Sequence, residues 1–156
     1  MTPGELVATL LKHGQVLSTA ESCTGGMVAA AITDVAGSSA VFDRGFVTYS
    51  NAAKTQMLGV PAGLIDAQGA VSEAVARAMA IGALANSAAS ITVSITGVAG
   101  PGGATKTKPI GLVHFACASR NGDVRHERMV FDGDRASVRV AARDHALQML
   151  AMKLAG

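Results

Sequence analysis

Apolar and polar residues follow one another along this chain in two periods, which predict strands and helices. Residues 90–96 (Ser-Ile-Thr-Val-Ser-Ile-Thr) alternate between β-branched apolar and hydroxyl side chains, as a strand does. After Asp134, a typical helix-capping residue, apolar side chains recur at helical spacing. That apolar face comprises Val138, Ala142, Ala146 and Met149. The two segments predict a buried strand and a long amphipathic final helix.

Capping and turn residues mark the boundaries of the other elements. A capping box, Thr2-x-x-Glu5, opens a helix that ends near Gly14. Asn121-Gly122 between two apolar runs predicts a tight antiparallel hairpin. The remaining predicted elements are strands over Gln15–Ala20, Phe46–Tyr49, Ile110–Ser119 and Val124–Phe131, and helices over Met27–Ala36, from Ser50 to before Gly59, and from Ser72 to about Ala85.

Strands that alternate with helices are typical of an α/β protein. We expect a three-layer α/β/α fold with a mixed, mostly parallel sheet and one antiparallel hairpin. No linker, internal repeat or low-complexity tract interrupts the pattern. We therefore expect residues 1–156 to form a single domain, for which a chain of this length can build one core.

Composition and charge narrow the class of partner. The formal net charge is +2, from 13 basic and 11 acidic residues spread along the chain, and there is no Trp and one Tyr. Without a basic run or aromatic platforms, nucleic-acid binding is not expected. No apolar run reaches membrane-spanning length, and the amino terminus lacks the regions of a signal peptide. We therefore expect a soluble cytoplasmic protein with no membrane partner.

Cysteine and histidine usage argues against a metal centre. The two cysteines, Cys23 and Cys117, are too few for a disulfide scaffold or for a zinc site built from cysteine. The four histidines show no metal-ligand spacing. We expect neither a metal ion nor a cofactor.

The segment at residues 21–26 (Glu-Ser-Cys-Thr-Gly-Gly) is the first candidate for chemistry. It places two potential nucleophiles, Ser22 and Cys23, between a predicted strand and a predicted helix. In an open α/β sheet, ligands bind at that end of a strand, and free N–H groups at a helix amino terminus can hold an oxyanion or a phosphate. The alternative interpretation is an ordinary tight turn in which Thr24 caps the helix.

Lys54 lies in about the first turn of the predicted helix that follows Ser50. The helix macrodipole disfavours an ammonium there, and partial burial would act in the same direction, so both effects would lower the pKa of Lys54. A neutral lysine can accept the proton of a serine hydroxyl, as in Ser–Lys hydrolases. The alternative is a solvated surface lysine, and the sequence pattern does not decide between the two.

Three further features belong to the same group of loops. Tyr49 ends a predicted strand and could relay or orient a proton between Ser22 and Lys54, or it could be a half-buried strand aromatic. The glycine-rich loop 97–103 could bring backbone N–H groups to a phosphate or could be a flexible connection, and it does not match the Walker A pattern. Arg44 could pair with a phosphate or with a neighbouring aspartate.

Five motifs from this chain carry a family resemblance, which extends from about Leu6 to Ala151. They are residues 19–26 (TAESCTGG), 37–39 (GSS), 44–54 (RGFVTYSNAAK), 69–73 (GAVSE) and 96–103 (TGVAGPGG). Together they resemble the carboxy-terminal domain of the CinA (competence/damage-inducible) family, whose active members are nicotinamide-nucleotide amidohydrolases, also called nicotinamide mononucleotide deamidases. Larger family members carry an additional amino-terminal domain, which we do not expect in this chain.

The resemblance implies hydrolysis of nicotinamide mononucleotide, a small-molecule nucleotide, to nicotinic acid mononucleotide and ammonia in pyridine-nucleotide salvage. It implies a metal-free amidase in which Ser22 is the nucleophile, Lys54 the general base and Tyr49 an assisting hydroxyl. Lys106 and Thr107 replace a Pro and a Glu that are frequent in the family, which bears on substrate preference. The residues expected to hold the oxyanion or the ribose phosphate are Cys23, Thr24, Gly25, Gly26, Arg44, Thr96, Gly97, Gly100 and Gly102.

Two other functions remain open at this point. A cysteine hydrolase would use Cys23, whose thiol is intrinsically the better nucleophile but has no evident His or Asp partner. A non-catalytic nucleotide-binding or regulatory module would need the fold and the pocket but no chemistry. The sequence leaves the oligomeric state open, a homo-oligomer included.

Overall fold

The alternating segment forms the central strand of a five-stranded sheet in the computed structural model, which describes residues 1–156. The strands are β1 (Leu17–Glu21), β2 (Phe42–Val47), β3 (Ile91–Gly97), β4 (Leu112–Ser119) and β5 (Val124–Val130). The helices are α1 (Pro3–Lys12), α2 (Met27–Thr33), α3 (Asn51–Leu58), α4 (Ala62–Gln68), α5 (Glu73–Ala85) and α6 (Arg135–Ala155), with a 3₁₀ turn at Ser38–Ala40.

The sheet is mixed, with the strand order β2-β1-β3-β4-β5. β1 pairs in parallel with both β2 and β3, whereas β4 runs antiparallel to β3 and to β5. The predicted hairpin around Asn121-Gly122 is confirmed as the β4–β5 pair. The predicted mostly parallel sheet is confirmed for the strand directions, because only β4 runs against the others. The four strand pairings, however, are two parallel and two antiparallel.

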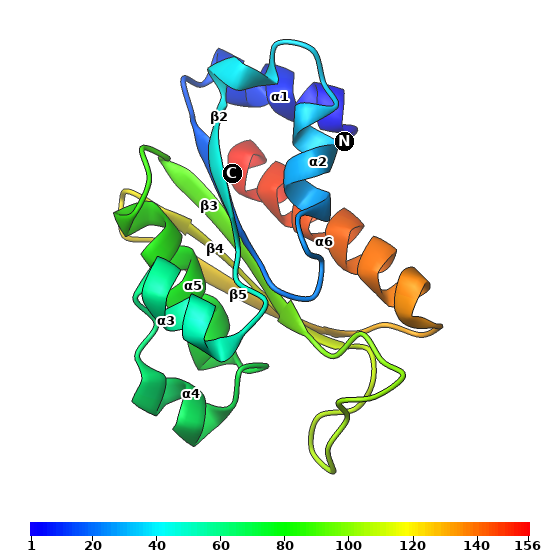
Figure 1. Cartoon of the computed structure of the whole chain (residues 1–156). Coiled ribbons are helices and arrows are strands. Elements are labelled where there is room, and N and C mark those ends of the chain that lie inside the picture. Colours follow the sequence, from blue (N-terminus) through cyan, green and yellow to red (C-terminus); the bar gives the residue numbers. More distant parts are fainter.

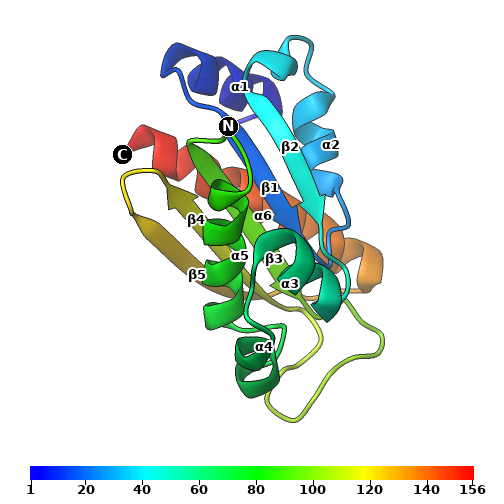
Figure 2. The same ribbon diagram turned by 60° about the vertical axis from the view of Figure 1, so that its left-hand side comes forward.

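Helices cover both faces of this sheet, which confirms the predicted three-layer α/β/α class (Figures 1 and 2). α3, α4 and α5 lie on one face, and α5 contacts β1, β3, β4 and β5. α1, α2 and α6 lie on the other face, where α6 contacts α1, α2, β3 and β4. The larger hydrophobic core, of 21 buried residues, lies on the side of α1, α2 and α6.

The polar face of β3 packs against α5 and not against water. Thr92 donates a hydrogen bond to the Ala80 carbonyl at 2.8 Å, and Ser94 donates to the Ala76 carbonyl at 2.6 Å. Both hydroxyl residues are fully buried. Both faces of β3 are therefore buried, although only one of them is apolar. The hydroxyl face can be buried because the small alanines of α5 let the helix backbone come close enough to accept its hydrogen bonds.

Several boundaries differ from the predicted ones. α2 ends at Thr33, whose hydroxyl bonds back to the carbonyls of the preceding turn, so the helix does not continue to Ala36. β2 begins at Phe42, earlier than predicted. Its first half was not recognised because Asp43-Arg44-Gly45 interrupts the alternation of apolar and polar residues in this edge strand. α4 was not predicted, because Pro61 precedes it and no side chain caps it.

Gly82 of α5 lies where α3 crosses that helix. A methyl group on Gly82 would overlap the backbone carbonyl of Leu58 at the end of α3. We expect Gly82→Ala to lower the free energy of unfolding by about 1–3 kcal/mol, as overpacking does, because a backbone contact cannot be relieved by a rotamer change. Urea denaturation followed by circular dichroism measures this loss.

Gly63→Ala is the matched control on α4, since a methyl group there would meet nothing within 4 Å. We expect that variant to be neutral or more stable by up to about 1 kcal/mol, because alanine favours helix over glycine. Equal unfolding free energies for the two variants would contradict the close approach of α3 to α5.

Candidate active site

A cavity of about 290 Å³ lies beyond the ends of β1 and β3 and is lined by loops from both helical layers. Its walls come from the turn after β1, the start of α3, the segment before α5, the glycine-rich loop and the first residue of α6. Of the residues singled out from the sequence, those that line it are Ser22, Cys23, Tyr49, Lys54, Thr96, Gly97, Gly100 and Gly102. The cavity thus combines three of the predicted loops at one place.

Ser22 and Lys54 are in direct contact in this cavity. Ser22 is the first residue after β1, and the Lys54 Nζ lies 3.1 Å from the Ser22 Oγ, within hydrogen-bond distance. Lys54 also donates to the Thr48 carbonyl at 2.9 Å. The Ser50 hydroxyl caps α3 by accepting from the Ala53 N–H, which fixes the turn of helix that carries the lysine.

The environment of Lys54 disfavours its charged form. The residue is 2% exposed and forms no ion pair with any carboxylate. Burial lowers the pKa of Lys54 below the ordinary lysine value. The alternative of a solvated surface lysine is therefore wrong, and the side chain is suited to accept a proton from Ser22.

Tyr49 lies at the mouth of the cavity and does not bridge Ser22 and Lys54. Its side chain is exposed, and its hydroxyl accepts a hydrogen bond from the Arg135 guanidinium at 2.7 Å. The expected proton relay through Tyr49 has no hydrogen bond to support it, because Lys54 reaches Ser22 directly. Tyr49 instead holds Arg135, which the sequence pattern did not single out.

Arg44 does not reach the cavity. Its guanidinium bonds the Asp43 carboxylate at 2.8 Å and the Asn86 carbonyl at 3.2 Å, near the beginning of β3. The expectation that Arg44 holds the phosphate is therefore not supported, because Arg44 lies on β2 away from the end of the sheet at which Ser22 lies. Arg135, at the start of α6, donates to the Gly100 carbonyl and lines the cavity in its place.

The turn after β1 is not capped in the way the sequence suggested. Thr24 is fully buried and its hydroxyl has no partner, so it does not cap α2. The buried Glu21 carboxylate caps this helix instead, accepting from the N–H groups of Val28 at 2.9 Å and Ala29 at 3.1 Å. The amino terminus of α2 is therefore occupied from within the protein. Thr24, Gly25 and Gly26 do not line the cavity.

A backbone donor is nevertheless free beside Ser22. The N–H of Cys23, a cavity-lining residue that is 6% exposed, finds no acceptor in the protein. Buried backbone N–H groups are rarely left unpaired, so this donor is available for a ligand oxygen. In the glycine-rich loop, the N–H groups of Ala99, Gly100 and Gly102 are likewise without a protein acceptor.

The thiol of Cys23 is poorly suited to act as a nucleophile. Burial raises the pKa of Cys23 to about 11, so the thiol stays protonated near neutral pH. No imidazole or carboxylate hydrogen-bonds its sulfur. The serine, which has a base within reach, is the better candidate.

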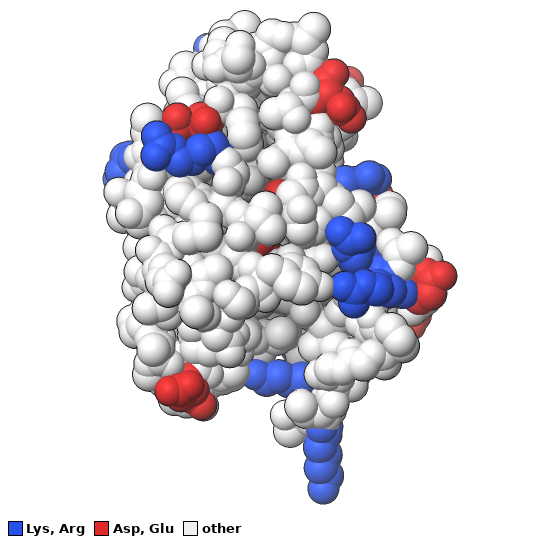
Figure 3. Space-filling view, in the orientation of Figure 1, with Lys and Arg blue, Asp and Glu red and all other residues white.

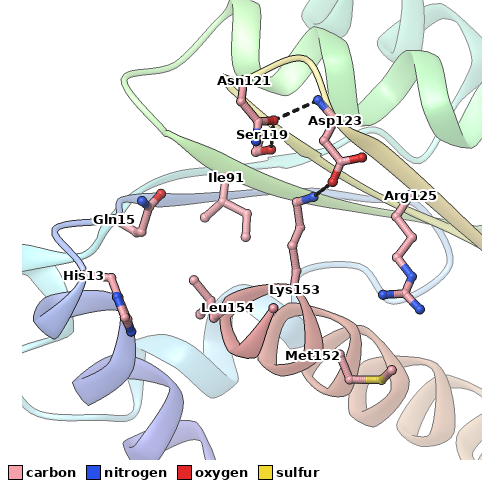
Figure 4. A pocket seen from close by; sticks show the side chains of 11 residues that line it. His13, Gln15, Ile91, Ser119, Asn121, Asp123, Arg125, Met152, Lys153 and Leu154 are labelled. Carbon is pink, nitrogen blue, oxygen red and sulfur yellow. Dashed lines mark hydrogen bonds and ion pairs between the residues drawn. The ribbon is translucent and has the colours of Figure 1, made fainter.

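A larger cavity, of about 410 Å³, lies at the opposite end of the sheet and carries no comparable chemistry (Figure 4). Its polar side chains pair with one another: Lys153 bonds the Asp123 carboxylate, and the Ser119 hydroxyl donates to the Asn121 side chain. It contains no nucleophile beside a base. We therefore place the candidate reaction in the smaller cavity.

Basic side chains gather over the amino-terminal half of α6, close to the candidate site (Figure 3). That half of the helix contains Arg135, Arg139 and Arg143. No group of three or more His, Cys, Asp or Glu side chains is arranged to hold a metal ion. No helix is both long enough and apolar enough to cross a membrane.

Comparisons with known proteins agree on one family. The family model described as the CinA C-terminal domain matches residues 2–154. A protein of Escherichia coli strain K12 named nicotinamide-nucleotide amidohydrolase PncC is 53% identical over 151 residues, which cover 96% of this chain and 92% of that protein. A putative competence-damage inducible protein of Symbiobacterium thermophilum is 52% identical over 94% of this chain, but the match spans 36% of that longer protein.

The fold is also similar to solved structures. The crystal structure of the competence/damage inducible protein CihA from Agrobacterium tumefaciens superposes with a TM-score of 0.92 at 48% sequence identity. The match covers 99% of this chain and 96% of that one. The similarity therefore extends over the sheet and both helical layers.

The lowered pKa of Lys54 makes folding stability depend on pH. The unfolded chain titrates near the ordinary lysine value of 10.5, and the folded protein releases the same proton at a lower pH. Between those two pH values the unfolded state binds more protons, so the free energy of unfolding should rise with pH. The buried thiols of Cys23 and Cys117, whose pKa values are raised, act in the opposite direction above about pH 9, but they are common to the wild type and to Lys54→Met. We therefore expect the free energy of unfolding of the wild type to rise with pH relative to that of Lys54→Met, measured by urea denaturation at intervals between pH 7 and 10.5.

Lys12→Met, which removes an exposed lysine at the end of α1, is the control. It should keep the pH dependence of the wild type. Parallel curves for all three proteins would contradict a lowered Lys54 pKa in the folded state.

Proposed function

Because the chain belongs to the CinA C-terminal domain family, we propose that it hydrolyses the carboxamide of nicotinamide mononucleotide to the carboxylate of nicotinic acid mononucleotide and ammonia. The predicted enzyme class, a hydrolase that acts on a carboxamide, is confirmed by relatives named nicotinamide-nucleotide amidohydrolase. The identity of the nucleophile, the base and the binding residues is our proposal.

The contact between Lys54 and Ser22 carries the proposal. A buried lysine without an ion pair, 3.1 Å from a serine hydroxyl, has little structural benefit but suits a general base. The neutral Lys54 amine accepts the Ser22 proton while the Ser22 Oγ attacks the amide carbon. The Cys23 N–H donates to the oxygen that becomes negative, and one such donor typically contributes about 3 kcal/mol to lowering the barrier.

The same two side chains complete the reaction. Protonated Lys54 gives its proton to the departing nitrogen, which leaves as ammonia, and Ser22 remains as an acyl ester. Lys54 then takes a proton from water, whose oxygen attacks the ester carbon; the bond to the Ser22 Oγ breaks, the product leaves as the carboxylate, and protonated Lys54 returns its proton to the Ser22 Oγ. No step needs a metal ion or a cofactor.

Arg135 and the glycine-rich loop are our candidates for the ribose phosphate. The guanidinium has five N–H donors, of which the Gly100 carbonyl and the Tyr49 hydroxyl take one each. The remaining donors and the free N–H groups of Ala99, Gly100 and Gly102 are suited to bind phosphate oxygens. Tyr49 then orients the arginine and is not a proton relay.

Two alternatives are less well supported. A cysteine hydrolase would need a thiolate, which the raised pKa of Cys23 disfavours. A non-catalytic binding module gives no reason to bury the Lys54 amine beside Ser22 without a carboxylate.

Ammonia release from nicotinamide mononucleotide tests the proposal. We expect Ser22→Ala to lower kcat by at least about 1,000-fold, because the loss of a nucleophile leaves only binding and oxyanion stabilisation. Cys23→Ala should keep most of the activity. Activity should also survive exhaustive treatment with a chelator.

Lys54→Arg separates a base from a simple positive charge. Arginine cannot supply a neutral base near pH 7, so this variant should be nearly as inactive as Lys54→Ala. Substantial kcat in Lys54→Arg, an inactive Cys23→Ala beside an active Ser22→Ala, or zinc-dependent recovery after chelation would each contradict the mechanism.

Substrate pairs that differ only in the phosphate test Arg135. We expect Arg135→Ala to lower kcat/KM for nicotinamide mononucleotide by about 10- to 100-fold, because a hydrogen bond to a charged group contributes about 1.5–3 kcal/mol. The variant should act on nicotinamide riboside, which lacks the phosphate, as the wild type does. Arg44→Ala is the control and should change neither value. An equal loss of kcat/KM on both substrates would show that Arg135 does not bind the phosphate.

A further inference from the structure

Arg139 of α6 holds the turn that contains the nucleophile. Its Nε donates to the Cys23 carbonyl at 3.0 Å, and its Nη2 donates to the Thr24 carbonyl at 3.3 Å. The side chain is half-buried, and it does not line the candidate cavity. Arg139 therefore contacts the turn from the side of α6 and has no contact with the site where substrate would lie.

A chain of hydrogen bonds leads from Arg139 to the free backbone donor. The Thr24 carbonyl belongs to the same peptide group as the Gly25 N–H, which donates to the Ser22 carbonyl at 3.0 Å. The Ser22 carbonyl in turn belongs to the same peptide group as the Cys23 N–H, which has no acceptor in the protein. Two peptide groups, Thr24–Gly25 and Ser22–Cys23, thus connect the guanidinium to the amide beside the proposed nucleophile.

We propose that Arg139 is a positioning residue that orients and polarises the Cys23 N–H for oxyanion binding through these two peptide groups. The inference rests on the proposed function, in that Cys23 is the donor to the oxyanion formed at Ser22. It assigns to α6 a part in the chemical step, although this helix contributes neither the nucleophile nor the base.

The physical basis is cooperativity along a hydrogen-bond chain. A peptide group whose carbonyl accepts a hydrogen bond becomes a stronger donor at its N–H, and the effect is larger when the first donor is charged. The turn is also held on its other side, because the Glu21 carboxylate accepts from Val28 and Ala29. With both sides fixed, the Cys23 N–H needs little reorganisation when charge develops on the substrate oxygen.

Glycine at position 25 is favoured by the same arrangement. Gly25 has a φ of 58°, in the left-handed region, and a methyl group there would lie 3.3 Å from the Arg139 Nη2. The positive φ favours glycine at this position, and a Cβ would in addition require the tip of the Arg139 side chain to shift.

The test compares Arg139→Ala with Arg143→Ala, which removes an arginine one turn further along α6 that pairs only with Asp144. We expect Arg139→Ala to lower kcat for nicotinamide mononucleotide by about 10- to 100-fold with KM nearly unchanged, somewhat less than the loss of a whole oxyanion donor. Added guanidinium ion at millimolar concentration should restore part of kcat. Arg143→Ala should match the wild type.

A second readout does not depend on the substrate. A fluorophosphonate probe forms a bond from the Ser22 Oγ to phosphorus and releases fluoride, and its phosphoryl oxygen uses the same donor. We expect the rate of labelling, followed by intact-protein mass, to fall in Arg139→Ala by a factor similar to that of kcat. Loss of labelling together with a wild type that releases no ammonia would leave the role of Arg139 standing and refute only the proposed substrate.

Three outcomes would overturn the inference. In the first, both kcat and the labelling rate of Arg139→Ala lie within twofold of the wild-type values. In the second, only KM changes. In the third, kcat falls but the rate of labelling does not. If Arg139→Ala does not fold, Arg139→Gln replaces it, because the amide can still donate to a carbonyl but has no charge. The Gln variant should lose kcat with a melting temperature close to that of the wild type, and retention of full kcat there would equally refute the role.

Discussion

The burial of one ammonium group beside one serine is the constraint on which the site depends. Lys54 is almost inaccessible to solvent, yet no carboxylate compensates it, and its two acceptors are the Ser22 hydroxyl and the Thr48 carbonyl. A fold retains such a group at a cost in stability, because desolvation disfavours the charge. That cost is understandable when the neutral amine is the working form.

The scaffold holds this pair from both faces of the sheet. On one face, α3 is seated against α5 through the close approach at Gly82, and α5 is in turn fixed by the hydroxyls of Thr92 and Ser94. On the other face, α6 holds the turn after β1 through Arg139. Ser22 therefore comes from the end of a strand of the central sheet and Lys54 from a helix on one of its faces, and contacts from both helical layers hold the segments that carry them.

Much of the fold follows from local signals that the structure confirms. The capping box at Thr2, the caps at Ser50 and Asp134 and the Asn121-Gly122 hairpin all lie where the sequence predicted them. Each depends on residues within a few positions of one another, so the pattern carries the information. α4 and the first half of β2 were missed because one lacks a side-chain cap and the other lacks alternation.

The sequence alone determined the α/β class and the family resemblance, and its motifs singled out Ser22 and Lys54 at the ends of predicted elements. That Lys54 is buried and in contact with Ser22 was decided by the tertiary structure. Only the tertiary structure decided which arginine lies beside the cavity. Arg44 lies close to the motif in sequence but is carried away along an edge strand, whereas Arg135 and Arg139 come from a helix about a hundred residues later. No local pattern records such a contact, since it arises only when α6 packs across the sheet beside the turn that follows β1.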